Sequence, residues 1–407
     1  MSSAATIKAA TEWSNWSGSL KFTPWNFGKP GNEDALRQVI RNCYTEGRQV
    51  RLAAAGHSST PLVETRGTLL HLHHFKGIIR RDDEQQTVTF GAGMTVHEAN
   101  AALQEIGLAL FNTGDVDVQT LAGAIATGTH GTGMKLRNLS SMLRGVRMVD
   151  YQGNVREFSS PADERWMNAM RVSLGALGIF TELTVRVVPL FKLTRTEHFT
   201  TVDSCLENFD ALAGENRNVD FYWYPRSDEI KIRILNEPGQ GTTEFPYSFR
   251  CVKHEEGWVG EILPRHRELR FDEMEYALPR EAGIACFKEV RNRIKARHRK
   301  AVAWRVLYRT IAGDANYLSP HYGRDSVSIS LHHNAGLPFD AFFNDIEPIF
   351  IHHSGRPHWA KKHNLKARQL RPLYPAWEAF QDVRRSLDPE GFFMNHYLKV
   401  LIGEYEE

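Results

Sequence analysis

The chain has 407 residues, of which 42% are hydrophobic and 24% charged, and its formal net charge is +2. This length predicts about two or three globular domains, and the small net charge gives no field that would favour nucleic acid or anionic lipid. The four cysteines match no zinc-binding spacing, so they predict reduced thiols in a cytoplasmic protein. No run reaches the ~18 apolar residues that a transmembrane helix requires, and no secretory signal is expected at the start; peripheral membrane association stays open.

The first half of the chain predicts a mixed unit of helices and strands. A helix is expected from Asn32, its N-cap, to Gly47, because the apolar residues between them have helical spacing. The strands are expected close together, so a doubly wound parallel sheet is disfavoured, and no Gly-x-Gly-x-x-Gly opens a helix as in a nicotinamide site. Expected after the first helix are strands at residues 49–53, 68–73, 78–80 and 87–90, a helix at 96–106, a hairpin at 146–150 and 155–158, and a strand at 182–188.

Two stretches of small residues lie in this first half. Leu52–Ser59 places three alanines and a glycine before His57, and Ala122–Gly133 surrounds His130. A loop with so little side chain lets backbone N–H groups approach an anion, and a concave nest of them can bind pyrophosphate. Either loop alone fits a buried turn with a structural histidine equally well. Together they favour a dinucleotide held between them, with His57 placed to touch what the pyrophosphate carries.

After Pro189 the composition changes to aromatic, strand-like runs. Strands are expected at residues 221–224, 231–235, 306–311 and 326–331, a basic helix at 282–298, and a last helix at 374–387. This order predicts a second α+β domain built on an antiparallel sheet.

Two patterns in the sequence imitate other kinds of site. The histidines of residues 71–74, 332–333 and 352–353 resemble metal-ligand clusters, but neighbours in a strand face opposite sides and no acidic residue has a matching spacing, so no metal site is predicted. The basic run at residues 291–300 fits one solvated helix face better than a nucleic-acid patch, given the nearly neutral chain.

Six segments occur together in a fixed order, and in this they resemble the sugar-lactone and alditol oxidases of the vanillyl-alcohol-oxidase flavoprotein superfamily. That family includes L-gulono-1,4-lactone oxidase, D-arabinono-1,4-lactone oxidase and alditol oxidase. The resemblance spans residues 20 to 400, approximately. The segments are residues 52–59, Asn112-Thr113-Gly114, residues 122–133, Met274-Glu275-Tyr276, Leu318-Ser319-Pro320 with Arg324-Asp325-Ser326, and Gly355–Lys361.

The resemblance implies an α+β fold with a two-part FAD-binding domain of the vanillyl-alcohol-oxidase (PCMH) type at residues 1–188. A substrate (cap) domain, an antiparallel sheet flanked by helices, would occupy residues 189–365, and residues 366–407 would return to the FAD-binding domain. FAD would lie between the two loops, bonded covalently through His57 to the flavin 8α-methyl carbon. The expected FAD-binding residues are Leu52, Ala53, Ala54, Ala55, Gly56, His57, Ser58, Ser59, Gly114, Asp115, Thr120, Gly123, Thr127, Gly128, Thr129, His130, Ile179, His358 and Lys361.

The same resemblance implies hydride transfer from an alcohol carbon to flavin N5. Arg309 and Lys361 match the basic pair of the family, in which the arginine binds substrate oxygens and the lysine supplies a point charge near the flavin. Gly114 stands at the position beside the flavin carbon that O2 attacks. A glycine there favours an oxidase that releases hydrogen peroxide, although it could equally serve a tight turn.

The chain departs from the family pattern at the expected active site. Leu307 stands where members usually carry a glutamate, two positions before the arginine, so a carboxylate that would contact the substrate is missing. Alditol oxidases carry a histidine and a threonine on the next strand, where this chain has Ser330 and His332, and Asp115 stands where relatives often have serine. We hypothesise that His332 or Asp115 replaces the lost contact. His332 better suits a base, because an imidazole exchanges protons near neutral pH.

These inferences predict an FAD-dependent oxidase of a sugar-derived lactone or polyol that uses O2 and forms hydrogen peroxide. Residues 355–364 look closer to the gulonolactone type than to the alditol type. Alternatives are an alditol oxidase, a dehydrogenase that passes electrons to another acceptor, and a flavin-binding protein with little turnover. The sequence predicts no nucleic-acid partner and no integral membrane segment, and it leaves the oligomeric state open.

Overall fold

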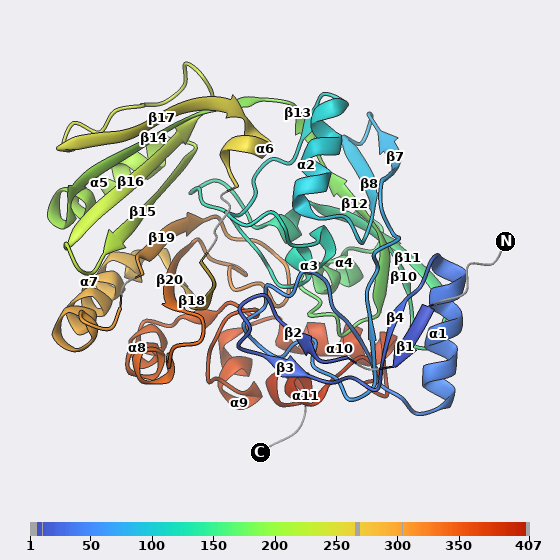
Figure 1. Cartoon of the computed structure of the whole chain (residues 1–407). Helices are drawn as coiled ribbons and strands as arrows, with labels where there is room; N and C mark the ends of the chain where they lie inside the picture. Colours follow the sequence, from blue (N-terminus) through green and yellow to red (C-terminus); the bar gives the residue numbers. More distant parts are fainter. Residues whose placement is uncertain (1–5, 10, 265–268, 303, 404–407) are drawn as a thin grey trace.

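The fold is described from a computed structural model, which covers residues 6–9, 11–264, 269–302 and 304–403. Two parts lie side by side in Figure 1: two small sheets with their helices, drawn blue to green, and a large antiparallel sheet. The last helices, drawn red, lie beneath the first part.

The first part contains a four-stranded and a five-stranded sheet. In the four-stranded sheet, of order β1-β4-β6-β5, β6 pairs in parallel with both β4 and β5, and β1 runs antiparallel to β4. The five-stranded sheet, of order β11-β10-β12-β8-β7, is antiparallel throughout. The strands are β1 (Thr6–Ala9), β4 (Asn26–Lys29), β5 (Val50–Leu52), β6 (Thr68–Leu70), β7 (Ile78–Asp82), β8 (Thr87–Gly91), β10 (Leu143–Val149), β11 (Val155–Ser159) and β12 (Ile179–Arg186), with short pairs β2 (Trp13–Ser14)–β3 (Lys21–Phe22) and β9 (Leu108–Ala109)–β13 (Val188–Pro189).

The helices of this part begin at capping residues that the sequence supplies. The Asn32 side chain accepts a hydrogen bond from the Ala35 N–H and caps α1 (Glu33–Thr45), as predicted. Thr95 and Glu98 form a capping box at the start of α2 (Val96–Glu105). Two shorter helices, α3 (Leu121–Ala126) and α4 (Glu164–Met170), complete this part.

The second part is the eight-stranded sheet, of order β17-β14-β16-β15-β19-β20-β18-β21. Its strands are β14 (Lys192–Thr201), β15 (Asn218–Tyr224), β16 (Glu229–Asn236), β17 (Arg250–Trp258), β18 (Phe271–Pro279), β19 (Val306–Ile311), β20 (Ser326–Asn334) and β21 (Arg356–Pro357). Helices α5 (Val202–Glu215), α7 (Gly283–Arg293) and α8 (Asp340–His352) pack on it, and the short α6 (Val259–Ile262) follows β17.

Aromatic pairs bind these helices to one face of the large sheet. Phe209 of α5 meets Tyr308 edge-on at 5.1 Å between ring centroids, and Phe350 of α8 stacks on Tyr276 at 5.0 Å. Because successive strand residues face opposite sides, the neighbours of Tyr276 and Tyr308 on β18 and β19 point to the other face. That other face borders the cavity described below.

The C-terminal helices α9 (Ala367–Leu370), α10 (Trp377–Leu387) and α11 (His396–Ile402) pack beneath the first part. The Asn395 amide donates to the carbonyl oxygens of Pro61 and Glu64, both at 2.8 Å. These bonds join the last segment to the first part, while the boundaries at residues 188 and 365 stay predictions.

The structure adds elements that the sequence-based expectations lacked, among them β14, β17, β18, α5 and α8, and it differs in two further local respects. β6 ends at Leu70 and α8 ends at His352, so of the histidine groups only His332 and His333 lie on a strand, and the alternation argument applies to that pair alone. Helix α7 ends at Arg293 and continues as a π-helical turn to His298. Within the described ranges, no helix is long and apolar enough to cross a membrane, and no group of three or more potential ligand side chains is arranged to hold a metal ion.

Candidate active site

Two cavities meet where the small-residue loops approach the large sheet. The empty space in and above the first is about 1290 Å³ and that of the second about 790 Å³, including space open to solvent. They share one set of lining residues: Gly56, His57, Ser58, Gln119 and Ala360. His57 therefore stands at the junction between a larger, mostly apolar space and a smaller, charged one.

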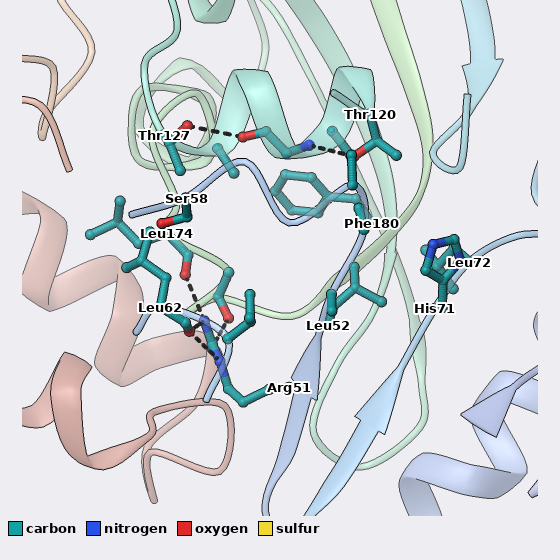
Figure 2. A pocket seen from close by; sticks show the side chains of 18 of the residues that line it. Arg51, Leu52, Ser58, Leu62, His71, Leu72, Thr120, Thr127, Leu174 and Phe180 are labelled. Atoms are coloured by element: carbon teal, nitrogen blue, oxygen red, sulfur yellow. Dashed lines mark hydrogen bonds between the residues drawn. The ribbon is translucent and has the colours of Figure 1, made fainter. Parts of the chain in front are cut away.

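The small-residue loop 53–58 forms one side of the first cavity, and larger apolar side chains such as Leu62, Leu174 and Phe180 line the rest, as Figure 2 shows. The Ala53 N–H donates to Leu70 and the Ser59 N–H to Ala360, but the N–H groups of residues 54–58 have no acceptor in the part of the chain that the structure describes. Gly56 has φ +69°, and a Cβ added there would lie 3.3 Å from atoms of Trp13, Asn15 and Trp16. Unpaired donors in a loop with no room for a side chain fit the pyrophosphate of a dinucleotide.

The buried side chain of Arg51 binds backbone carbonyl groups of several segments beside the first cavity (Figure 2). Its guanidinium donates to the carbonyl oxygens of Leu62 at 2.6 and 2.9 Å, Leu174 at 3.0 Å and Gly175 at 2.8 Å, and also to that of Phe393. Burial lowers the pKa of Arg51 only to about 10, so it stays charged near neutral pH. One buried cation thus connects both walls of the first cavity to the C-terminal segment.

The surroundings of His57 fix the orientation of its ring and lower its pKa. Its ring stacks on Trp16, with centroids 4.8 Å apart and planes inclined by 26°. Burial, together with the charge of Lys361, lowers the pKa of His57 to about 4. The imidazole is therefore neutral at neutral pH, and a neutral ring keeps the nitrogen lone pair that bond formation to a cofactor needs.

Strand register brings the floor of the second cavity together. Glu273 lies opposite His332 and Glu275 opposite Ser330 across β18 and β20. On the other side of β20, Leu307 of β19 lies opposite the same Ser330. Since residues two apart share a face of a strand, two carboxylates of β18 reach the face to which Leu307 belongs.

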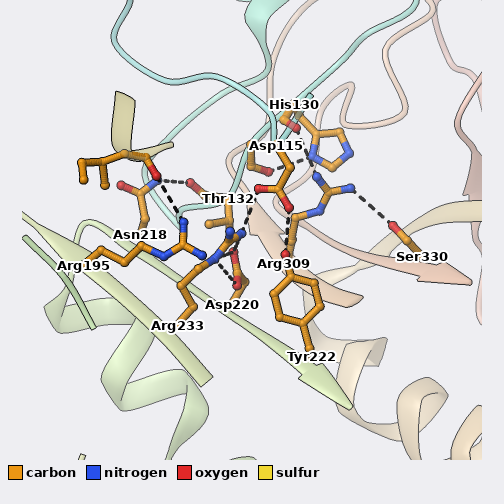
Figure 3. Close-up of polar contacts among 12 residues, drawn as sticks. Asp115, His130, Thr132, Arg195, Asn218, Asp220, Tyr222, Arg233, Arg309 and Ser330 are labelled. Carbon is orange, nitrogen blue, oxygen red and sulfur yellow. Dashed lines mark hydrogen bonds and ion pairs between the residues drawn. The ribbon is translucent and has the colours of Figure 1, made fainter. Parts of the chain in front are cut away.

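The first charged group in this cavity centres on Arg309 (Figure 3). Its Nη2 lies 2.9 and 3.0 Å from the two carboxylate oxygens of Glu275 and 3.3 Å from Ser330 Oγ. His130 Nε2 lies 2.6 Å from the same carboxylate. Burial would raise the pKa of Glu275, but the charges of Arg309 and His130 hold it well below its usual range. Arg309 Nε is buried and has no acceptor among the described residues, and Arg309 borders the cavity.

The second charged group joins Lys361 to Glu273. Lys361 Nζ lies 2.6 Å from Glu273 Oε2, and His332 Nε2 lies 3.5 Å from Glu273 Oε1. Burial acts to raise the pKa of Glu273, but Lys361 and His332 outweigh it and lower that pKa. His332 Nδ1 donates to the Arg305 carbonyl at 3.2 Å, which leaves Nε2 directed at Glu273.

Gly114 and Asp115 form the opposite wall of the second cavity. The Asp115 carboxylate accepts from the Tyr222 hydroxyl at 2.8 Å and from Arg233 at 3.1 Å, so it is held toward the large sheet (Figure 3). A Cβ added at Gly114 would lie 3.1 Å from the carbonyl oxygen of His130. This glycine therefore sits where an extra methyl group would crowd the wall.

Most of the predicted site residues border one of the two cavities. Ser330 and Gly128 border neither: Ser330 lies behind Arg309, and a Cβ at Gly128 would meet Pro320 and Val172. In the first cavity lie Leu52, Ala53, Ala54, Ala55, Thr120, Gly123, Thr127 and Ile179; in the second lie Ser59, Gly114, Asp115, Thr129, His130, Arg309, His332, His358 and Lys361; Gly56, His57 and Ser58 border both.

In place of the glutamate missing at Leu307, the sequence suggested His332 or Asp115, and two further carboxylates were overlooked. Glu273 and Glu275 bring these to the second cavity from β18 rather than β19. The sequence carried a signal, since Glu275 belongs to one of the family-like segments and Glu273 shares its strand face. Trp16 was also missed, and no pattern in the sequence ties it to the site.

Comparisons with known proteins agree with this geometry. The family model described as D-arabinono-1,4-lactone oxidase matches residues 183–265 and 245–401, and a model for an FAD binding domain matches residues 27–159. A protein named L-gulono-1,4-lactone dehydrogenase from Mycobacterium tuberculosis is 32% identical, over 96% of this chain and 99% of its own length. The chain belongs to the D-arabinono-1,4-lactone oxidase family.

Other members of the family and one solved fold are similar over the whole chain. L-gulonolactone oxidase from Mus musculus is 28% identical over 95% of this chain and 97% of its own length, and alditol oxidase from a Streptomyces species is 27% identical over 97% and 99%. Cholesterol oxidase from B. sterolicum has a TM-score of 0.85 at 16% identity, covering 98% and 97%, and indicates the fold alone. The predicted α+β class, with an FAD-binding domain and a second part built on an antiparallel sheet, is confirmed.

Proposed function

We propose that this chain is an FAD-dependent oxidase of a sugar-derived lactone or polyol, similar in substrate to L-gulono-1,4-lactone oxidases. The observation that carries the proposal is the meeting, at His57, of a cavity bordered by a loop of free backbone donors and a cavity lined by charged side chains. When bound, FAD would accept a hydride from the alcohol carbon of the substrate and pass the electrons to O2 as hydrogen peroxide.

The residues of the first cavity would hold the cofactor. The free N–H groups of residues 54–58 would bind its pyrophosphate, and His57 would be bonded to it covalently. Support for the bond comes from the neutral imidazole at the junction of the cavities. Denaturing electrophoresis of the purified protein under ultraviolet light tests it: wild type should fluoresce at the protein band, and His57→Ala should not.

The residues of the second cavity would orient the substrate and receive its proton. Arg309, held by Glu275, would present its guanidinium to a substrate oxygen, and Lys361 would lie near the cofactor. His332, next to Glu273, would receive the hydroxyl proton. Turnover that is unchanged in His332→Ala would reject that role.

Oxygen as the acceptor is supported by Gly114, where a Cβ would come within 3.1 Å of a backbone oxygen. The deciding experiment is a panel of lactones and alditols with a peroxide readout in air. Peroxide formed in proportion to product supports the oxidase, and Gly114→Ala should lower the rate with O2 while leaving the rate with an artificial acceptor unchanged.

One observation favours a second candidate, a dehydrogenase of the same substrate class: a relative at 32% identity is named a dehydrogenase. Product formed only with a dye or quinone acceptor, without peroxide, would favour it over the oxidase. We also propose a reducing compartment such as the cytoplasm, because all four cysteines are unpaired thiols.

A further inference from the structure

The side chains that line the second cavity include more carboxylates than lysine and arginine cations. Among the described lining residues, the lysine and arginine cations are Arg309 and Lys361, and they face three carboxylates, Asp115, Glu273 and Glu275. Each cation is already held by a carboxylate, Arg309 by Glu275 and Lys361 by Glu273. An anion that entered this cavity would find no uncommitted charge.

The pair of Lys361 and Glu273 is a buried pair rather than a surface one. The exposed fractions of the two side chains are 17% and 8%, and their charged atoms lie 2.6 Å apart. A second contact, from His332 at 3.5 Å, holds the other carboxylate oxygen. A charge in such a place is costly to leave unpaired, so Glu273 keeps Lys361 in the pair unless a ligand offers a better partner.

We propose that Glu273 is a specificity-determining residue: by committing Lys361 to an ion pair, it restricts the cavity to neutral, polyhydroxylated molecules. The molecule that it excludes is the open-chain aldonate that a sugar lactone forms on hydrolysis, which carries the same hydroxyl groups and one carboxylate. The proposal rests on the proposed function, because it assigns a sugar-derived substrate to the second cavity.

The chemistry of the two ligands explains why one carboxylate can separate them. A lactone or an alditol offers hydroxyl and carbonyl oxygens, which carry no charge and therefore need not displace Glu275 from Arg309 or Glu273 from Lys361. An aldonate brings a carboxylate that must displace Glu273 from Lys361 or lie unpaired beside it. Like charges in a confined site repel strongly.

The test compares binding of L-gulono-1,4-lactone and L-gulonate to the flavin-loaded protein by calorimetry without oxygen, with the flavin reduced beforehand by dithionite so that the lactone cannot react. Wild type should bind the lactone and bind the aldonate at least about tenfold more weakly. Glu273→Gln removes the charge with little change of shape and should strengthen aldonate binding by about tenfold or more, with less change for the lactone. Glu273→Asp keeps the charge and should keep the wild-type preference.

The matched control is Glu197→Gln. Glu197 is also buried and paired with a lysine, Lys231, in the same sheet, but it borders neither cavity. It should leave the ratio of the two affinities unchanged. If Glu273→Gln does not accumulate as folded flavoprotein, Glu273→Ala removes the same charge and takes its place.

An affinity ratio that is the same in wild type and Glu273→Gln would overturn the proposal, and so would equal binding of both ligands by wild type. The proposed function fails separately: if wild type oxidises no lactone or alditol but binds the lactone selectively, and Glu273→Gln removes that selectivity, the inference stands while the oxidase assignment falls. If neither ligand binds to either protein, both are wrong.

Discussion

The two cavities that meet at His57 are built on opposite principles. The first is mostly apolar, and one side of it is a continuous small-residue loop with free N–H donors. The second is walled by charged side chains that come from loops and from three strands of the large sheet. A continuous loop binds through the shape of its backbone, whereas the second cavity depends on how several distant side chains neutralise one another.

If the second cavity depends on its side chains, removing its central cation should have the largest effect on the reaction. Arg309→Met should lower kcat/KM for the best substrate by about 10²–10³-fold, the cost of losing a placed donor at a reacting oxygen. The FAD content should stay at the wild-type level, because Arg309 borders only the second cavity.

A suitable control is Arg195→Met, which removes another buried arginine of the large sheet, paired with Glu197 and outside both cavities. Steady-state kinetics with the cofactor content measured in parallel check both variants. Equal losses in the two would mean that Arg309 acts only through the stability of the sheet.

If the first cavity depends on backbone shape, a single methyl group in its loop should damage it. Gly56→Ala places a Cβ 3.3 Å from its neighbours and asks an L-residue to adopt φ +69°, a conformation that costs about 1–2 kcal/mol. The expected result is a lower free energy of unfolding and a lower flavin-to-protein ratio.

Gly47→Ala separates these two causes. Gly47 has φ +62°, but a Cβ there would meet nothing within 4 Å. It should therefore show the loss of stability without the loss of flavin, measured by denaturant unfolding and by absorbance of the purified proteins. A full flavin content in Gly56→Ala would contradict the role of this loop as the cofactor cradle.

The charged cavity should also respond to acid through a histidine buried at its edge. Burial lowers the pKa of His358 from 6.5 to about 3, so the unfolded chain takes up this proton at a higher pH than the folded one. Stability is therefore fully present above pH 6.5 and falls as the pH drops toward 3, with a slope of about 1.4 kcal/mol per pH unit for one proton. His358→Gln should reduce the slope of the unfolding free energy over that interval; identical slopes would show that His358 does not stay neutral.

The smallest effect is expected for ion pairs that lie outside both cavities. Asp228 binds Arg291, in the last turn of α7, and Lys295, in the π-helical turn that follows, and partly exposed pairs of this kind contribute about 0–1 kcal/mol each. Asp228→Asn weakens both pairs, so it should change the free energy of unfolding by no more than about 2 kcal/mol and leave kcat/KM unchanged. A large loss of activity would mean that the reaction also depends on ion pairs far from the cavities, and not only on the side chains that line the second cavity.

The small-residue loop of the first cavity could be predicted because residues 52–59 are neighbours in the chain. Three alanines and a glycine before His57 predict free backbone donors wherever that loop lies, and the position of Gly56 needs a residue without a side chain. The helix from Glu33 was equally predictable, since its cap and its buried stripe are local.

The second cavity could not be predicted in the same way. Glu273 is 88 residues from Lys361 in the chain, and the loss of a glutamate at Leu307 directed attention to His332 and Asp115 instead of Glu273. The replacement depends on the order of the strands, because β20 lies between β18 and β19 and aligns Glu275 and Leu307 with the same Ser330.

What the amino-acid order settles in this protein is local: the small-residue loops, the helix caps, the alternation of the strands and the family to which the motifs point. Which charges neutralise one another is settled by strand order and register, since electrostatic energies depend on distances in space that spacing along the chain does not encode. The sequence shows no partner for the charge of Lys361. The folded sheet supplies one, because it brings the Glu273 carboxylate within 2.6 Å of Lys361 Nζ.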